Sequence, residues 1–309
     1  MFEDAFKLPS FAKINWQLRV RGRRADGFHE LRTIFQTITL RDEISFVARE
    51  DEKLHLTSDS PDIPVDESNL ILRAAVALKK KYEIDRGASL HLAKVIPVEA
   101  GLGGGSSNAA IALLGLAHLW KIATNRQELA EIGAKLGADV PFFLTGGTAL
   151  GTGLGTEISP INEMGAKYML VVKPEAKVST AEAYKALNSP ALTKADSDII
   201  LSISRADEQF TDSYPNALHN DFEPVVFHLK PEIGCVKDAL LRVGARRALL
   251  AGSGSSVFGV FDNSVAQERA IEMLRKESDS WRIFPCATLS RAAYLAALGA
   301  CAASLERAV

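Results

Sequence analysis

The chain has little cysteine, almost no net charge and no long hydrophobic run, and each shortage excludes a class of protein. Its three cysteines, Cys235, Cys286 and Cys301, are too few and too scattered for a disulfide framework or a zinc knuckle. A net charge of -2 gives no electrostatic footprint for nucleic acid. No segment reaches the roughly 18 apolar residues of a membrane helix, and residues 1–10 lack a signal-peptide core. We therefore expect a cytoplasmic protein with no nucleic-acid or membrane partner.

The glycine that the chain does contain is concentrated before one apolar helix. Residues 97–110 read PVEAGLGGGSSNAA and separate an expected strand, 89–96, from a helix beginning near Ser107. Glycine permits a positive φ and a close backbone approach, so successive N–H groups can converge on an anion at the helix N-terminus. A flexible Gly/Ser linker is the alternative, but the apolar residues that follow recur at helical spacing. We interpret this segment, residues 97–110, as a phosphate cradle.

Two familiar phosphate motifs are absent from the cradle. It has no Gly-Lys-Ser/Thr ending and is therefore not a P-loop. Ser106 stands where a dinucleotide fingerprint has its third glycine. The cradle therefore belongs to some other class of phosphate site.

Strands are expected before the cradle. Residues 11–20 alternate as a half-buried strand, with Lys13 and Asn15 on its polar face. Strands at 33–40, 43–47 and 53–57, with a turn at Arg41 and Asp42, make an antiparallel group. Ser68 or Asn69 caps a helix that runs to Tyr82, and Gly87 breaks the chain before the strand 89–96.

Asp139 follows the next expected helix, which Asn125 and Glu128 begin as a capping box and Gly137 ends. It has two possible roles: it caps a helical turn leading into Pro141, or it is a catalytic carboxylate. The second glycine cluster, residues 146–155, is interpreted as a tight β connection, because no helical pattern follows it.

The C-terminal part alternates strands and helices. Strands are expected at 168–173, 247–250, 257–261 and 281–287, with helices at 180–187, around 216–228, at 231–243 and at 264–276. This order predicts a split α/β sandwich of the ferredoxin-like type. The alanine-rich tail, residues 291–309, is expected to form one final helix.

Three segments in order carry a resemblance to a known family: FAKIN at 11–15, the cradle, and AGSGSSVFG at 251–259. This arrangement resembles the three motifs of the GHMP kinases. Further segments at 25–29, 136–141 and 220–224 resemble the branch that acts on a cytidine diphosphate derivative. The resemblance implies an α+β fold of two domains, with the active site in the cleft between them. Residues 1–160 would form an ATP-binding, ribosomal-S5-like α/β domain, and residues 161–309 a ferredoxin-like domain with a helical tail.

The activity that the resemblance implies is phosphorylation of the 2-hydroxyl of 4-diphosphocytidyl-2-C-methyl-D-erythritol by ATP, in the non-mevalonate route to isoprenoid precursors. Lys13 and Asp139 would be the catalytic pair, with Asp139 as the base. Mg²⁺ is expected, with no ligands assigned, and the protein is expected to be a monomer or loose homodimer. The alternatives are a GHMP kinase for mevalonate, homoserine or a sugar, and a regulatory relative that binds ATP without turnover.

The resemblance also implies the binding residues. For ATP these are Asn69, Leu70, Lys94, Pro97, Gly101, Leu102, Gly103, Gly104, Gly105, Ser106, Ser107 and Asn108. For the second substrate they are Asn15, Phe28, His29, Asp139, Thr180, Tyr184, Gly252, Ser253 and Gly254. Phe28 and Tyr184 offer flat faces to a pyrimidine, although Tyr184 also suits core packing and His29 also suits a plain surface. Glu99 is expected to point to solvent or toward the metal, since its charge would oppose a triphosphate.

Overall fold

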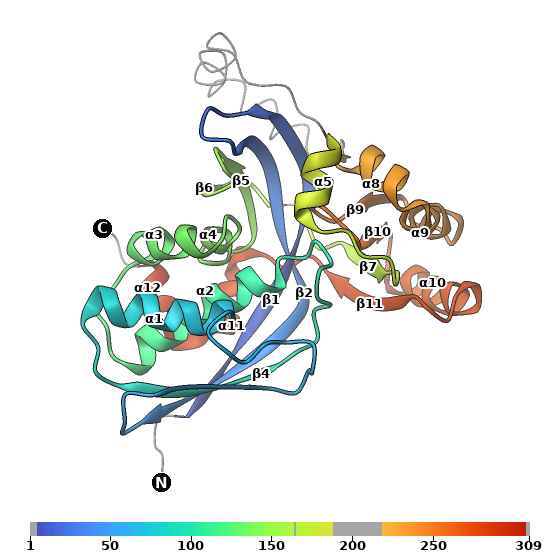
Figure 1. Ribbon diagram of the computed structural model, residues 1–309. Helices are drawn as coiled ribbons and strands as arrows, with labels where there is room; N and C mark the ends of the chain where they lie inside the picture. Colours follow the sequence, from blue (N-terminus) through green and yellow to red (C-terminus); the bar gives the residue numbers. More distant parts are fainter. Residues whose placement is uncertain (1–4, 164, 188–217, 307–309) are drawn as a thin grey trace.

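The computed structural model describes residues 5–163, 165–187 and 218–306 and contains two β-sheets (Figure 1). The strands of the first sheet are β1 (Phe6–Arg23), β2 (His29–Arg49), β3 (Leu54–Ser58), β4 (Gly87–Ala93), β5 (Thr148–Thr152), β6 (Glu157–Pro160) and β8 (His219–Asn220). They follow the order β3-β4-β2-β1-β8, and β5 joins β2 to β6. The long antiparallel pair β1–β2 is the centre of this sheet. In the described ranges no helix is long and apolar enough to cross a membrane.

Strand β2 corrects two expectations. The strands predicted at 33–40 and 43–47 are one continuous strand, and Arg41 and Asp42 form no turn. The reason is that the Asp42 carboxylate is buried and accepts hydrogen bonds from the backbone of Val95 and Ile96, so the strand continues through this polar pair while Arg41 stays exposed. The group is also not wholly antiparallel, because β3 pairs with β4 in parallel.

Strand β1 is buried on both faces over its middle. Ile14 and Trp16 pack against Phe258 of the second sheet, as the alternation predicted for its apolar face. The polar face is equally covered, with Lys13 only 4% and Asn15 only 1% exposed. The expectation of a half-buried strand was therefore wrong, because hydrophobic alternation does not report what covers a polar face.

Four helices pack beside the first sheet: α1 (Leu70–Tyr82), α2 (Gly104–Leu119), α3 (Arg126–Leu136) and α4 (Val140–Phe143). The Asn69 cap and the Asn125–Glu128 capping box are both present, as predicted. Helix α2 is apolar on every side and almost wholly buried, because the sheet and the other helices surround it. These neighbours fix the position of its N-terminus.

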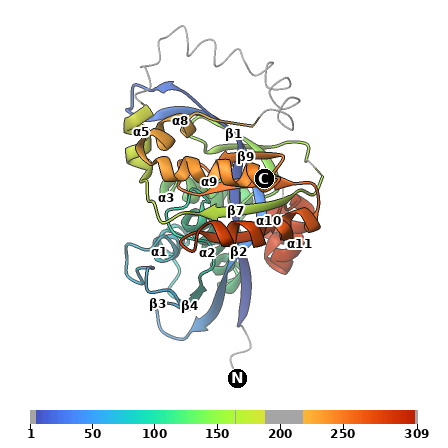
Figure 2. The same ribbon diagram turned by 90° about the vertical axis from the view of Figure 1, so that its right-hand side faces the viewer.

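The second sheet contains β7 (Tyr168–Lys173), β9 (Arg247–Leu250), β10 (Val257–Phe261) and β11 (Arg282–Ala287). All its pairs are antiparallel and the order is β11-β7-β10-β9, which confirms the ferredoxin-like expectation. Its helices are α5 (Thr180–Leu187), α8 (Glu223–Leu229), α9 (Pro231–Arg242) and α10 (Ser264–Glu277). Figure 2 shows α9 and α10 running side by side across it.

Two expectations for the C-terminal part need correction. The helix expected around 216–228 begins only at Glu223, while His219 and Asn220 form β8, which pairs in parallel with β1; residues 216 and 217 lie outside the described ranges. The tail is not one helix but α11 (Arg291–Leu298), the 3₁₀ turn η2 (Gly299–Ala302) and α12 (Ala303–Glu306).

The tail, red in Figure 1, packs against the N-terminal core, where it contacts β1, α2 and α3. Tyr294 is fully buried there and its hydroxyl donates to the Phe143 carbonyl of α4. The chain therefore returns to its first half after completing the second sheet. A domain boundary at residue 160 stays a prediction.

Candidate active site

The cradle adopts the left-handed backbone that its glycines were expected to provide. Gly101 and Gly103 have φ of 74° and 69°, and α2 begins directly afterwards at Gly104. A Cβ on Gly101 would lie 1.9 Å from the Ala251 carbonyl oxygen. Only glycine fits this approach, so the cradle leads to a helix N-terminus whose free N–H groups suit an anion.

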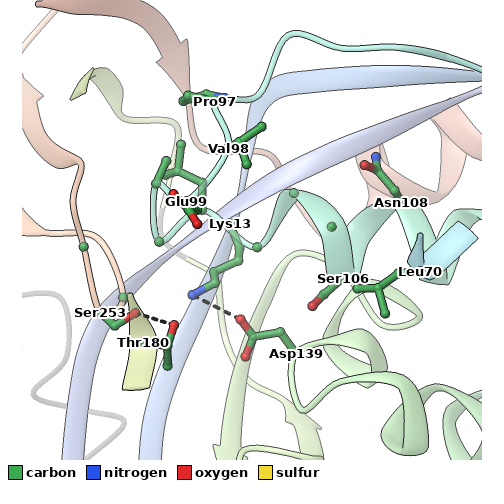
Figure 3. Close-up of a pocket in the computed structure, with 18 of the residues that line it drawn as sticks. Lys13, Leu70, Pro97, Val98, Glu99, Ser106, Asn108, Asp139, Thr180 and Ser253 are labelled. Carbon is green, nitrogen blue, oxygen red and sulfur yellow. Dashed lines mark hydrogen bonds and ion pairs between the residues drawn. The ribbon is translucent and has the colours of Figure 1, made fainter. Parts of the chain in front are cut away.

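A cleft of about 660 Å³ lies along the cradle, bordered also by β1, β2, α5 and the loop 252–254 (Figure 3). The predicted site residues that line it are Lys13, Asn15, Asn69, Leu70, Lys94, Pro97, Gly101, Leu102, Gly103, Gly104, Gly105, Ser106, Asn108, Asp139, Thr180, Tyr184, Gly252, Ser253 and Gly254. Phe28, His29 and Ser107 are the predicted residues outside this lining. One cavity thus brings together most residues of the two predicted binding sets, although the role of each residue stays a prediction.

Lys13 and Asp139 meet at the centre of this cleft. The Lys13 ammonium lies 3.3 Å from the Asp139 carboxylate and donates to Asn15 Oδ1 at 2.8 Å. Asn15 in turn donates to Thr33, a cleft residue that the sequence did not single out. Asp139 precedes α4 but makes no capping hydrogen bond, so the capping alternative has no support. An accessible carboxylate beside a buried ammonium is suited to accept a proton from a substrate hydroxyl.

The second Gly-Ser loop packs directly on the cradle. The Ser256 N–H donates to the Ala100 carbonyl at 3.2 Å, and a Cβ on Gly252 would lie 3.2 Å from Lys13 Nζ. Asn220 of β8 supports this loop by donating to the carbonyls of Leu250 and Gly252. Sequence reasoning gave Asn220 no role, although it stands in the segment 220–224 that carried the resemblance.

Tyr184 and Phe222 line the end of the cleft nearest α5, and His29 lies beside them outside the lining. His29 stacks on Tyr184 with centroids 4.6 Å apart, and Tyr184 meets Phe222 edge-on at 4.8 Å. Burial, with the nearby Asp139 charge, raises the pKa of Tyr184 to about 12, so its phenol stays protonated. Burial and the Arg23 charge lower the pKa of His29. Phe28 is 62% exposed at the tip of the β1–β2 hairpin.

Two further residues of the cradle have polar partners other than the Lys13–Asp139 pair. Ser107 is fully buried and accepts a hydrogen bond from Ser10 inside the core. Glu99 is exposed, with its carboxylate 3.9 Å from the Lys177 ammonium. The described residues contain no cluster of three His, Cys, Asp or Glu side chains that could hold a metal by themselves.

Family models match both parts of the chain. The GHMP kinases N terminal domain matches residues 69–147, and the GHMP kinases C terminal domain matches residues 201–279. Together with the cradle and the two-sheet fold, these matches define a GHMP kinase. A homoserine kinase from Cytophaga hutchinsonii, with a TM-score of 0.68 at 19% identity over 94% of this chain and 96% of its own, shares the fold.

Much nearer relatives carry one name. A protein from Chlorobium phaeobacteroides is 42% identical over 84% of this chain and 87% of its own length, and one from Pseudomonas entomophila is 40% identical over 88% and 89%. Both are named 4-diphosphocytidyl-2-C-methyl-D-erythritol kinase. A crystal structure of 4-(cytidine 5'-diphospho)-2C-methyl-D-erythritol kinase has a TM-score of 0.74 and 32% identity, over 92% of this chain and 99% of its own. The chain belongs to the family of 4-diphosphocytidyl-2-C-methyl-D-erythritol kinases.

Proposed function

We propose that this protein transfers the γ-phosphoryl group of ATP to the 2-hydroxyl of 4-diphosphocytidyl-2-C-methyl-D-erythritol, a step of the non-mevalonate route to isoprenoid precursors. The observation that carries the proposal is the Lys13–Asp139 pair, 3.3 Å apart in the cleft that the cradle borders. The name that these two relatives share supports the choice of substrate. We place the reaction in the cytoplasm, which supplies ATP and suits three free cysteines.

The proposed chemistry needs alignment and charge stabilisation more than a covalent intermediate. The cradle and the N-terminus of α2 hold the phosphates through backbone N–H groups. The substrate hydroxyl attacks the γ-phosphorus, its proton passes to the Asp139 carboxylate, and the bond to ADP breaks. Lys13 stabilises the negative charge that develops on the attacking oxygen.

The two ends of the cleft would separate the two substrates. Asn69, Leu70 and Lys94 lie with the cradle and would bind ATP. At the other end, His29 and Tyr184 present flat rings suited to a pyrimidine, together with the exposed Phe28. Figure 3 shows Thr180 hydrogen-bonded to Ser253, at 3.0 Å, where the loop 252–254 would meet the same substrate.

Magnesium fits the residues at the centre of the cleft. The side chains of Ser106 and Asp139 both border the cleft (Figure 3). The chain segment that leads to Asp139 is also close to Ser106, since Ser106 Oγ lies 3.5 Å from the position of a Cβ on Gly137. Magnesium is usually held by one or two carboxylates together with substrate phosphates and water. We propose Ser106 and Asp139 as the side chains that would hold it, where it would neutralise phosphate charge.

An assay of ADP release tests the proposal, with 4-diphosphocytidyl-2-C-methyl-D-erythritol, mevalonate and homoserine offered separately. We expect turnover with the cytidine derivative alone. A preference for mevalonate or homoserine would overturn the substrate assignment and leave a GHMP kinase. ATP binding without turnover of any of the three would favour the regulatory alternative.

A further inference from the structure

One buried carboxylate beside the cradle has no part in the proposed chemistry. The Asp42 side chain is fully buried in the middle of β2 and accepts four hydrogen bonds. Its Oδ1 accepts from the backbone N–H groups of Val95 and Ile96, both at 2.7 Å. Its Oδ2 accepts from Lys94 Nζ at 2.8 Å and from Asn108 Nδ2 at 3.0 Å. The two oxygens therefore serve different partners, one the backbone and the other two cleft side chains.

The partners of Asp42 flank the cradle on both sides. Lys94, Val95 and Ile96 form the turn that precedes Pro97, whereas Asn108 lies in the second turn of α2. Lys94 Nζ lies 3.3 Å from the position of a Cβ on Gly104, the first residue of that helix. The ammonium is thus beside the helix N-terminus, where a phosphate is expected.

A lysine in this position needs a partner to stay charged and in place. The Lys94 side chain is only 7% exposed, and burial lowers its pKa while the Asp42 carboxylate opposes that shift. Four rotatable bonds would otherwise let the ammonium move away from the cradle, with a gain in side-chain entropy. The ion pair with Asp42 opposes this movement, together with a hydrogen bond that the ammonium donates to the Ile96 carbonyl.

We infer that Asp42 is a positioning residue for the nucleotide, which holds the Lys94 ammonium against the phosphate cradle. The inference rests on the proposed function only in taking ATP as the ligand of Lys94. Asp42 itself does not line the cleft. Its effect on ATP must therefore pass through Lys94.

The variant Asp42→Asn distinguishes the role of Oδ2 from that of Oδ1. Its amide oxygen can take the place of Oδ1 and keep both backbone bonds, while its NH₂ group faces Lys94 and Asn108, which are themselves donors. Titration calorimetry with ATP alone should show a Kd about tenfold higher, as expected for one lost charge-assisted bond. Asp51→Asn is the matched control, because Asp51 pairs with Arg49 outside the cleft, and its Kd for ATP should equal that of the wild type.

A double-mutant cycle with Lys94→Met shows whether Asp42 acts through Lys94. We expect Lys94→Met and the double variant Asp42→Asn/Lys94→Met to have the same Kd for ATP. A double variant that binds ATP more weakly than Lys94→Met would overturn the inference, as would wild-type affinity in a folded Asp42→Asn. The comparison of Lys94→Met with the double variant does not need Asp42→Asn alone to fold. The double variant has no buried charge here, and in Lys94→Met the Asp42 carboxylate keeps its hydrogen bonds from Val95, Ile96 and Asn108.

Thermal unfolding of each variant separates a structural role from positioning. A merely structural Asp42 would lower the unfolding temperature and leave the Kd for ATP of the folded protein unchanged, which contradicts the inference. The titration requires no turnover. A wild-type protein that binds ATP without phosphorylating the cytidine derivative would therefore overturn the proposed function and leave the cycle interpretable.

Discussion

The Lys13 ammonium lies 3.3 Å from the Asp139 carboxylate, and the two side chains differ sharply in exposure. Lys13 projects from the middle of β1 with 5% of its side chain exposed, whereas Asp139 precedes α4 with 32% exposed. A substrate entering the cleft therefore reaches the carboxylate more readily than the ammonium behind it. This asymmetry suits a base that meets a hydroxyl and a cation that acts from within the protein.

Replacing Asp139 by asparagine removes the proton acceptor with almost no change in shape. We expect kcat to fall about 100- to 10,000-fold, the usual contribution of a general base, and KM for ATP to rise by a smaller factor because the proposed magnesium loses one ligand. Steady-state ADP release measures both constants. Asp262→Asn, at an exposed pair with Arg246, is the control and should keep wild-type turnover. Full activity in Asp139→Asn would exclude Asp139 as the base.

A methyl group on Gly101 would disrupt the contact between the cradle and the second Gly-Ser loop. The new Cβ would lie 1.9 Å from the Ala251 carbonyl oxygen, at a φ of 74°. We expect Gly101→Ala to lose about 2–3 kcal/mol of unfolding free energy, from overpacking and backbone strain. Gly105→Ala is the matched control: its Cβ meets only Leu70, at 3.5 Å, within helix α2. Chemical denaturation compares the two, and equal stabilities would show that the cradle adapts.

The Tyr184 ring, rather than its hydroxyl, is expected to contribute to binding of the cytidine derivative. Tyr184→Ala should raise KM for this substrate about 5- to 150-fold, the range for one lost base-stacking contact. Tyr184→Phe keeps the stack on His29 and should bind nearly as well as the wild type. Steady-state kinetics at saturating ATP distinguish the two. An equal loss in both variants would instead assign the contribution to the hydroxyl.

His29 makes the stability of the protein depend on pH in a defined direction. Burial and the Arg23 charge lower its pKa below the usual 6.5, so the folded state binds fewer protons than the unfolded state just below pH 6.5. This contribution to stability is present above pH 6.5 and is lost as the pH falls through the folded-state value. The thermal unfolding temperature should therefore fall less steeply from pH 7.5 to pH 5 in His29→Gln than in the wild type. Parallel curves would contradict the prediction.

The tail should stabilise the protein through Tyr294. Its buried hydroxyl donates to the Phe143 carbonyl, and Tyr294→Phe should cost about 1 kcal/mol of unfolding free energy. Tyr294→Ala also removes the ring between Phe11 and Gly146 and should cost about 3–5 kcal/mol. Urea denaturation measures both losses. Tyr168→Phe, at a partly exposed strand residue, is the control and should be neutral. A neutral Tyr294→Ala would show that the tail contributes no stability.

Local features could be predicted from the sequence because their causes are local. Glycine is favoured where φ is positive, so the cradle was recognisable from Gly101 and Gly103 before any contact was known. The caps at Asn69 and Asn125 follow from hydrogen bonds to neighbouring residues. The ferredoxin-like sheet followed from the alternation of strands and helices.

The tertiary structure decided what covers each polar group. Arg41 and Asp42 resemble a turn in sequence, yet Asp42 is buried because Val95, Ile96, Lys94 and Asn108 supply donors from distant elements. The 3.3 Å between Lys13 and Asp139 likewise depends on how β1 and α4 pack, which no local pattern encodes. By itself the sequence determined which residues prefer a turn, a cap or a core. Only the folded chain determined their partners, because those partners lie far apart in sequence and meet through packing.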